Sequence, residues 1–478
     1  MAASSSEVQK LSRGALISLV IGSMIGSGIF ALPAAFARAT GALGAIFAWL
    51  IAGAGMLMLA FVFQTLAQRK PSLDAGIYAY AKAGFGEYIG FASAAGYWIG
   101  CCLADVACLI LIKATLGQFF PVFGDGTTPV AIAGASLLLW SVHVLVLRGI
   151  KDAAALNTIA TAAKIIPLLA FIAVAAFAFD SDVFARNFWG AGEPGPDSVF
   201  AQTRATMLLT VFVFVGIEGA SVYSRYAKDR ADIGIATVLG FLSVLALLVL
   251  VTLLSYGVLP RPELAALPTP SMAGVMQVMV GTWGSVFISV GLLISILGNY
   301  LSWSLLAAEV LHSAAVHRTM PAFLARENAH KVPAGALWLT NVVIQLFVLV
   351  TWFADYAFTL ALKMTSAMTL VPYFFVAAYG LKLAWTGDTY AGEARARRIG
   401  WTQSAIATVY AAGMLYASGP KFMLLSAILY APGTVLFWLA RRERNLKTFR
   451  PVEAVMFAAL MIAACAGVYA LAAGTITV

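Results

Sequence analysis

The ionisable side chains inside long apolar segments of this sequence include Asp105, Lys113, Lys164, Glu218 and Lys363. A charge held at membrane depth costs about 3 kcal/mol or more, so such residues are expected to have a function. Glu218 either titrates in a working site or caps backbone N–H groups. Lys164 either serves a site or extends to the nearer membrane surface. Asp105 either attracts a cation or pairs with Lys113 or Lys363. The sequence leaves these alternatives open for each of the three residues, Glu218, Lys164 and Asp105.

Glycine clusters interrupt two of the apolar segments. The first reads GSMIGSGIF, with Gly22, Gly26 and Gly28, and the second reads FVGIEGAS, with Gly216 and Gly219. Glycine lowers helix stability and lets another group approach the backbone closely, although small residues also serve helix packing in membranes. A broken helix exposes N–H groups that suit a carboxylate and carbonyl groups that suit an ammonium. Two facing breaks would therefore hold both ends of an α-amino acid headgroup.

The composition indicates what kind of elements must position these residues. The chain has 478 residues, of which 62% are hydrophobic and 11% charged. Soluble domains are about 45–50% apolar and about 25% charged, so the sequence is typical of a membrane protein. Strands of a membrane barrel alternate over about 10 residues, whereas the apolar runs here continue for about 20. The sequence predicts an all-α polytopic membrane protein.

The apolar runs predict about thirteen spans, and the basic residues between them predict an orientation. The spans lie near 14–37, 42–66, 86–119, 129–147, 156–179, 204–224, 233–258, 281–310, 334–352, 355–381, 401–418, 421–440 and 452–475. With the N-terminus in the cytoplasm, 22 of the 30 Lys and Arg residues fall in inner segments and five in outer segments; the other three lie within spans. This bias predicts an inner-membrane protein with a cytoplasmic N-terminus and an external C-terminus.

The two glycine-interrupted spans occupy matching positions in two halves of the chain. Each is the first member of a set of five spans, one set covering residues 14–179 and the other 204–381. Interrupted segments at corresponding positions indicate an inverted repeat whose binding site lies at the midplane. Residues 1–13 form a cytoplasmic tail in this scheme, and residues 401–475 form two or three extra C-terminal helices.

Other functional classes find little support in the sequence. The net charge of +9 is spread over the loops and forms no basic stripe, so a nucleic-acid partner is not expected. The four cysteines lie inside apolar segments without metal-ligand spacing, and no phosphate-binding loop or nucleophile motif occurs. We therefore expect neither an enzyme nor a bound cofactor or metal. A channel or membrane receptor is a remote alternative, because no filter loop or appended soluble domain is evident.

The glycine-rich motifs belong to longer stretches that resemble the amino acid–polyamine–organocation superfamily over nearly the full chain. Within it the sequence is most similar to the bacterial arginine/ornithine antiporters. The matching stretches are GSMIGSGIFALP from Gly22, DAGIYAYAKAGFGEYIGF from Asp74, FVGIEGASVYSRYAKDRADIG from Phe214, SWSLLAAEVLHSAA from Ser302 and RTMPAFLARENAHKVPAGALWLTN from Arg318. This resemblance implies the five-plus-five inverted-repeat fold, called LeuT-like, with helices 1 and 6 broken.

The resemblance also implies which residues contact a substrate. They lie on the two interrupted segments and on helices 3 and 8, and comprise Ser23, Ile25, Gly26, Ser27, Gly28, Cys101, Asp105, Phe212, Ile217, Glu218 and Trp303. The family usually has a tryptophan at the position of Phe212, and often other small or amide residues at Cys101 and Asp105. Lys164 corresponds to a lysine that takes the place of a sodium ion in proton-coupled relatives. Lys164 and Glu218 are therefore the candidate coupling residues.

These observations predict a secondary transporter that works by alternating access and exchanges cationic amino acids of the arginine/ornithine type. The alternative is a proton-coupled symporter or permease for another amino acid or an amine, such as lysine, histidine or a polyamine. The expected partners are the amino acid or amine, the lipid bilayer and, in the coupled alternative, protons. The sequence leaves open whether the protein is a monomer or a homodimer.

Overall fold

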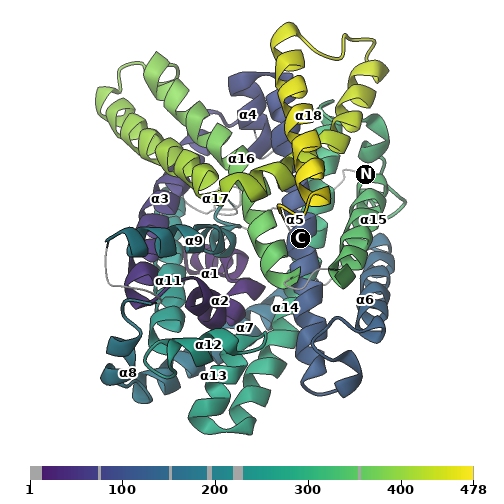
Figure 1. Ribbon diagram of the computed structural model, residues 1–478. Coiled ribbons are helices and arrows are strands. Elements are labelled where there is room, and N and C mark those ends of the chain that lie inside the picture. The colour runs from purple at the N-terminus through teal and green to yellow at the C-terminus, as the bar shows by residue number, and fades with distance from the viewer. Residues whose placement is uncertain are drawn as a thin grey trace, which may run out of the picture.

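The computed structural model describes residues 13–73, 77–149, 153–190, 196–218, 230–353 and 357–476, and within these ranges every regular element is a helix (Figure 1). Eight of these helices are long and apolar enough to cross a membrane, and shorter apolar helices accompany them. The predicted all-α polytopic architecture is therefore confirmed.

The first half of the chain contains the first broken helix and four further spans. Its helices are α1 Arg13–Met24, η1 Ser27–Ala31, α2 Leu32–Ala39, α3 Ala42–Arg69, α4 Ile77–Phe85, α5 Glu87–Gly117, η2 Pro121–Phe123, α6 Pro129–Leu147 and α7 Ala153–Phe177. The start of α6 illustrates the local rules: Pro129 occupies the first turn, and the Thr128 side chain accepts a hydrogen bond from the Ala131 N–H.

The second half begins after the short α8, Ser181–Arg186. Its helices are α9 Pro196–Phe214, α11 Arg230–Ser255, α12 Arg261–Ala266, α13 Ser271–Val280, α14 Thr282–Val316, η4 Ala322–Ala325, α15 Ala334–Val350, η5 Thr351–Phe353 and α16 Ala357–Thr386. Helix α9 begins eight residues before residue 204, the predicted start of the sixth span. The polar turns before Arg204 continue the helix beyond its apolar part, and Pro196 suits a first helical position.

The C-terminal spans are α17, Ala394–Glu443, and α18, Pro451–Ala472. The sequence predicts two spans where α17 stands, with a boundary near residue 420. The helix is interrupted at that boundary, because Gly419 has non-helical backbone angles, with φ 72° and ψ 171°, and Pro420 cannot donate a backbone hydrogen bond. The predicted interruption is therefore present as a bend between two long arms.

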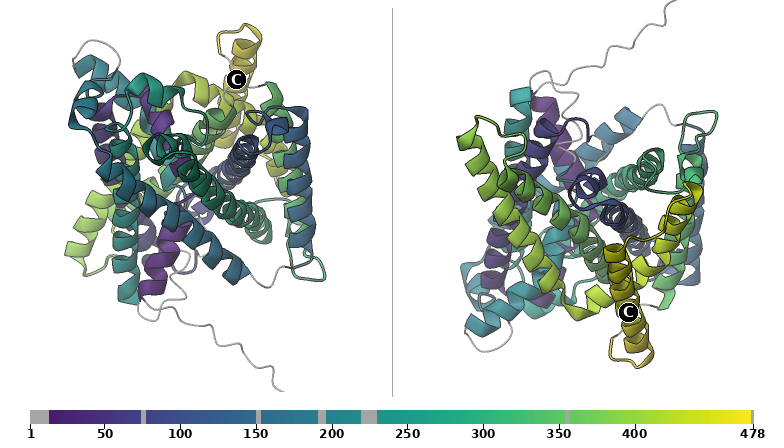
Figure 2. Two further views of the ribbon diagram at one scale, coloured as in Figure 1. Left: turned by 90° about the horizontal axis from the view of Figure 1, so that it is seen from below. Right: turned by 90° about the horizontal axis from the view of Figure 1, so that it is seen from above.

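Helix α5 lies at the centre of the bundle, and α18 lies at its edge. In both end-on views α5 and α14 run side by side through the middle of the molecule (Figure 2). The most apolar part of α5 is 89% buried inside the protein, whereas the most apolar part of α18 is only 11% buried. Side chains on α5 therefore face protein on all sides, and most of those on α18 lie on the outer surface of the bundle.

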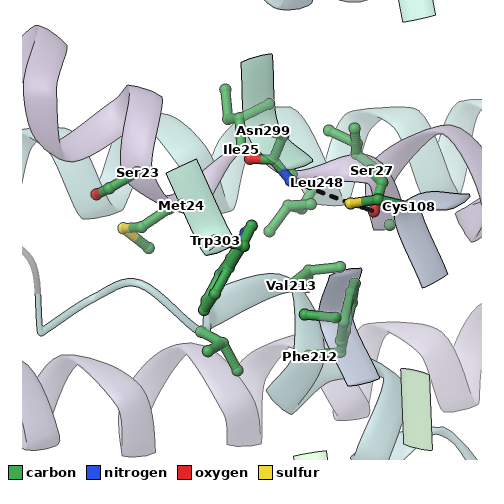
Figure 3. Close-up of a pocket in the computed structure, with 15 residues that line it drawn as sticks. Ser23, Met24, Ile25, Ser27, Cys108, Phe212, Val213, Leu248, Asn299 and Trp303 are labelled. Carbon is green, nitrogen blue, oxygen red and sulfur yellow. Dashed lines mark hydrogen bonds between the residues drawn. The ribbon is translucent and has the colours of Figure 1, made fainter. Parts of the chain in front are cut away.

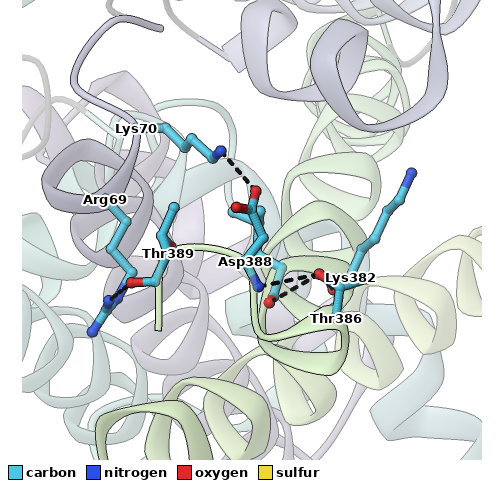
Figure 4. Close-up of polar contacts among 7 residues, drawn as sticks. Arg69, Lys70, Lys382, Thr386, Asp388 and Thr389 are labelled. Atoms are coloured by element: carbon cyan, nitrogen blue, oxygen red, sulfur yellow. Dashed lines mark hydrogen bonds and ion pairs between the residues drawn. The ribbon is translucent and has the colours of Figure 1, made fainter. Parts of the chain in front are cut away.

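One end of the bundle collects the loops that the basic residues predict to be internal. In Figure 1 this end carries α4 and the α17–α18 loop. There Lys70 contacts Asp388 at 2.8 Å and Arg69 donates to the Thr389 carbonyl at 2.6 Å (Figure 4). Arg69 also contacts Glu393 at 2.7 Å, so the end of α3 is joined to the α16–α17 loop. The Lys70–Asp388 hydrogen bond raises the pKa of Lys70 and lowers the pKa of Asp388. Because the pair is solvent-exposed, it contributes little to stability.

The opposite end carries α8, α12 and α13 (Figure 1). Arg38 at the end of α2 donates to the carbonyls of Ala265 and Leu267, at 2.7 and 3.1 Å. Arg261 at the start of α12 donates back to the carbonyl of Ala37 at 2.8 Å. These hydrogen bonds join the second half of helix 1 to α12 and to the loop that precedes α13.

Candidate functional site

The predicted break in helix 1 is present and sits beside Gly26. Helix α1 ends at Met24, and Gly26 has extended backbone angles, with φ −109° and ψ −167°. A second helical stretch then runs from Ser27 to Ala39. Within the part of the chain that the structure describes, no side chain caps the start of this second stretch, so its first N–H groups suit an anion.

The predicted break in helix 6 is present as well, on the side that the structure describes. Helix α9 ends at Phe214, and residues 215–218 form a turn in which Gly216 has a positive φ of 109°. Gly219 and the rest of the predicted sixth span lie outside the described residues. At the α9 terminus the carbonyls of Phe212 and Phe214 accept hydrogen bonds from the N–H groups of Val215 and Ile217, at 3.2 and 3.1 Å. Carbonyl groups at a helix end suit an ammonium group.

The two breaks are in direct contact. A Cβ atom added to Gly216 would lie 2.5 Å from the Ser23 carbonyl oxygen, so only glycine fits there. The Ser23 hydroxyl donates to the Gly216 carbonyl at 3.3 Å and to the Val20 carbonyl at 2.9 Å. The ends of α1 and α9 therefore face each other at the same depth of the bundle.

A cavity opens between these two breaks, and most of the predicted contact residues border it (Figure 3). The predicted residues at its wall are Ser23, Ile25, Gly26, Ser27, Gly28, Phe212 and Trp303. The other lining residues are Met24, Ile29, Ala104, Cys108, Val213, Val215, Leu248 and Asn299. The wall combines helix ends with apolar and aromatic side chains, which is typical of small-molecule sites.

Phe212 forms one wall by packing against the glycine of the helix 1 break. A Cβ atom on Gly28 would lie 2.7 Å from the Phe212 ring, so glycine is required for this approach. Trp303 borders the same cavity from α14 (Figure 3). Two aromatic side chains thus line the cavity.

Four predicted residues do not border the cavity: Cys101, Asp105, Ile217 and Glu218. Cys101 and Asp105 lie on α5 within a turn of the lining residue Ala104, and Ile217 is buried in the helix 6 turn. All four are buried, so the cavity must extend past its present wall before a ligand reaches them.

Asp105 has no ion-pair partner among the described residues. Its side chain is fully buried, and neither carboxylate oxygen has a hydrogen-bond partner there. Lys113 donates to the Thr351 hydroxyl at 3.1 Å, and the Lys363 ammonium lies 5.9 Å from the centre of the Phe422 ring. The alternative in which Asp105 pairs with Lys113 or Lys363 is therefore wrong for this structure.

Glu218 joins three helices at the helix 6 break. It accepts hydrogen bonds from the Tyr97 hydroxyl on α5 and from the Tyr373 hydroxyl on α16, the latter at 2.5 Å. It also accepts from the Gly216 N–H at 3.2 Å, so it caps the turn as one of the alternatives predicts. We call Tyr97, Glu218 and Tyr373 the carboxylate clasp. The tyrosines were not predicted, because neither stands out from the other aromatic residues of the spans.

Lys164 lies beside the helix 1 break. Its side chain is 3% exposed, and its ammonium donates to the Gly22 carbonyl at 3.3 Å and to Asn299 Oδ1 at 3.4 Å. The alternative in which Lys164 reaches the membrane surface is therefore wrong. Asn299 was not predicted, although its amide lies inside an apolar helix four residues before Trp303, and therefore on the same helical face.

The comparisons with known proteins identify the family of this chain. A family model described as amino acid permease matches residues 11–437. An arginine/ornithine antiporter of Pseudomonas aeruginosa is 52% identical over 475 residues, which cover 98% of each chain. An L-lysine transport protein of Corynebacterium glutamicum is 41% identical over 477 residues, or 97% of this chain and 95% of that protein. An arginine/agmatine antiporter of Chlamydia pneumoniae is 39% identical over 442 residues, or 91% of each chain. The chain belongs to the amino acid permease family of the amino acid–polyamine–organocation superfamily, whose multi-pass transporters have the LeuT-like fold.

Proposed function

We propose that this protein exchanges cationic amino acids across the bacterial inner membrane, with arginine and ornithine as the first candidate pair. The observation that carries the proposal is the match to an arginine/ornithine antiporter, 52% identical over 98% of the chain. Relatives named for lysine and for arginine/agmatine transport point to the same class of substrate, a long side chain ending in a cation.

The two helix breaks supply the groups that hold the substrate headgroup. The N–H groups at Ser27 and Gly28 bind the α-carboxylate, and carbonyl groups at the end of α9 bind the α-ammonium. Ser23, Ile25 and Gly26 fix the distance between the two ends. Because every α-amino acid has this headgroup, the breaks provide affinity and not side-chain selectivity.

Selectivity comes from the side chains around the substrate tail. Phe212 and Trp303 cover the aliphatic stem, and Asp105 and Cys101 border the far end on α5. The unpaired, fully buried carboxylate of Asp105 supports this role, because a buried charge needs a partner. The Tyr300 hydroxyl on α14 is also buried without a hydrogen-bond partner in the described residues and lies within electrostatic range of Asp105. A cationic tail would satisfy both groups.

Alternating access requires the cavity to open to each side in turn. The carboxylate clasp lies on the side of the cavity where α5 begins, about 10 Å along the helix axis from Ala104. Glu218 must release Tyr97 or Tyr373 before a ligand can leave by that route. On the other side the contacts of Arg38 and Arg261 restrain the outer half of helix 1. Opening of one side while the other stays closed gives exchange.

Lys164 takes the place of a coupling metal ion. A fixed ammonium that donates to the Gly22 carbonyl neutralises the partial negative charge at the end of α1. With this charge supplied by the protein, transport needs no sodium. In the second candidate function, the protein is a proton symporter for lysine or an amine. A proton carried by Lys164 or Glu218 would then be the coupling ion, whereas exchange requires none.

The proposal includes the organisation and orientation of the chain. Residues 14–179 and 204–381 are the two inverted repeats, residues 401–475 are accessory, and residues 1–13 lie in the cytoplasm. The predicted inner loops contact one another at one end of the bundle, which supports placing all of them on the same side of the membrane. A reporter fused after Ile476 tests the orientation, since the proposal requires it to lie outside the cytoplasm.

Counterflow in liposomes tests the function as a whole. Purified protein is reconstituted with one labelled amino acid and a panel of unlabelled amino acids and amines. The proposal requires arginine and ornithine to exchange with each other faster than with neutral amino acids. Exchange that is confined to neutral or acidic amino acids would replace the proposed substrate class.

A further inference from the structure

A chain of four buried polar groups links Lys164 to the cavity wall. The Lys164 ammonium lies 3.4 Å from Asn299 Oδ1, Asn299 Nδ2 lies 3.7 Å from Cys108 Sγ, and Cys108 Sγ lies 3.8 Å from Ser27 Oγ. Each of the four residues is at most 5% exposed. They come from helices α7, α14 and α5 and from the helix 1 break, and Figure 3 shows the last two links at the cavity.

The donor and acceptor groups allow only one direction of hydrogen bonding along these four residues. An ammonium can only donate, so the oxygen of Asn299 must face Lys164 and its NH2 group must face Cys108. The Cys108 thiol then accepts from Asn299 and donates to the Ser27 oxygen. The Ser27 hydroxyl is left with its own hydrogen, for which no hydrogen bond is formed within the described residues. Because Ser27 borders the cavity, that hydrogen is available to a ligand.

We propose that Asn299 and Cys108 are positioning residues, which orient the Ser27 hydroxyl as a donor to the α-carboxylate of the substrate. The inference rests on the proposed function and deepens it, because it explains how the charge of Lys164 acts on the substrate. Without the two residues the hydroxyl rotates freely and also serves as an acceptor, which an anion does not need. The preorganised donor favours ligands that carry a carboxylate over amines that lack one.

Substitutions of Cys108 separate this role from simple packing. Cys108→Ser keeps one donor and one acceptor at nearly the same place, whereas Cys108→Ala removes both with a small loss of volume. Cys102→Ala is the matched control, because Cys102 is fully buried on the same helix but does not border the cavity. Asn299→Asp keeps the acceptor for Lys164 and the size of the side chain, but it removes the donor to Cys108.

The test measures binding of arginine and of agmatine, its decarboxylated counterpart, to purified full-length protein. Cys108→Ala and Asn299→Asp should weaken arginine about 5- to 15-fold, the worth of one net hydrogen bond, and leave agmatine nearly unchanged. Cys108→Ser and Cys102→Ala should bind arginine within about twofold of the original protein, a difference below the worth of such a bond. Equal losses in Cys108→Ala and Cys108→Ser, or wild-type affinity in Asn299→Asp, would overturn the inference.

Failure of the proposed substrate class gives a different result. If the unaltered protein binds no cationic amino acid, the substrate assignment fails on that measurement alone. The Cys108 series is then read with the neutral amino acid that the protein does bind, because its α-carboxylate is the same. Rescue by serine but not by alanine supports the inference with either ligand, and the same loss in both contradicts it.

Discussion

The backbone of Gly216 lies directly against the carbonyl oxygen of Ser23, so that the interruption of helix 6 touches the interruption of helix 1. Residues 193 positions apart in the chain thus share one contact at the centre of the bundle. The contact brings the two helix ends to the same depth, where terminal N–H and carbonyl groups suit the two charges of an amino acid headgroup.

Gly216→Ala should disrupt this contact. Its positive φ of 109° costs about 1–3 kcal/mol for a residue with a Cβ atom, and that atom would also overlap the Ser23 carbonyl. We expect loss of transport and a lower melting temperature in detergent. Gly413→Ala on α17 is the control, since nothing lies within 4 Å of the added atom. Equal transport by the two variants would mean that the breaks need not touch.

Glu218→Ala should abolish or severely slow transport while the protein still folds and inserts. The substitution leaves the hydroxyls of Tyr97 and Tyr373 without their shared acceptor and the turn at Gly216 without its cap. Tyr97→Phe and Tyr373→Phe, which remove one bond each, should slow turnover less. Initial rates of exchange in liposomes measure the effect. Near-normal turnover with unchanged affinity in Glu218→Ala would reduce Glu218 to a structural cap.

Lys164→Ala should be inactive even at high substrate concentration, because the Gly22 carbonyl and the Asn299 amide then lose the charge that orders the helix 1 break. Transport by the unaltered protein should be the same in sodium and in choline buffer. Lys363→Ala is a suitable control, since Lys363 contacts an aromatic ring away from the cavity. Transport that rises in proportion to sodium would contradict the role given to Lys164.

Asp105→Asn should weaken arginine or lysine by about 10- to 150-fold and hardly affect neutral amino acids. A charge-assisted bond shielded from water contributes roughly 1.5–3 kcal/mol, which corresponds to that range. Neither Lys113 nor Lys363 pairs with Asp105, so the substitution leaves no lone buried ammonium behind. Binding of one cationic and one neutral ligand to both proteins measures the effect. Equal losses for both ligands would assign Asp105 a structural role.

Much of the fold follows from the sequence because membrane helices must be long, apolar and separated by charged loops. The two breaks were predictable as well, since Gly26 and Gly216 interrupt otherwise continuous apolar runs. The start of α9 was not, because a helix can continue through polar turns beyond the membrane. The partners of Glu218 and Lys164 depend on which helices lie side by side. That packing brings Tyr97, Tyr373 and Asn299 to the site from helices far apart in the chain.

The uptake of labelled arginine into liposomes tests the central claim most directly. Vesicles are loaded with ornithine, with a neutral amino acid or with buffer alone, at equal pH on both sides and without sodium. The account predicts rapid uptake only into ornithine-loaded vesicles, with one ornithine released for each arginine taken up. Equal uptake into buffer-loaded vesicles when a proton gradient is imposed, with no stimulation by internal ornithine, would contradict exchange and establish proton-coupled symport.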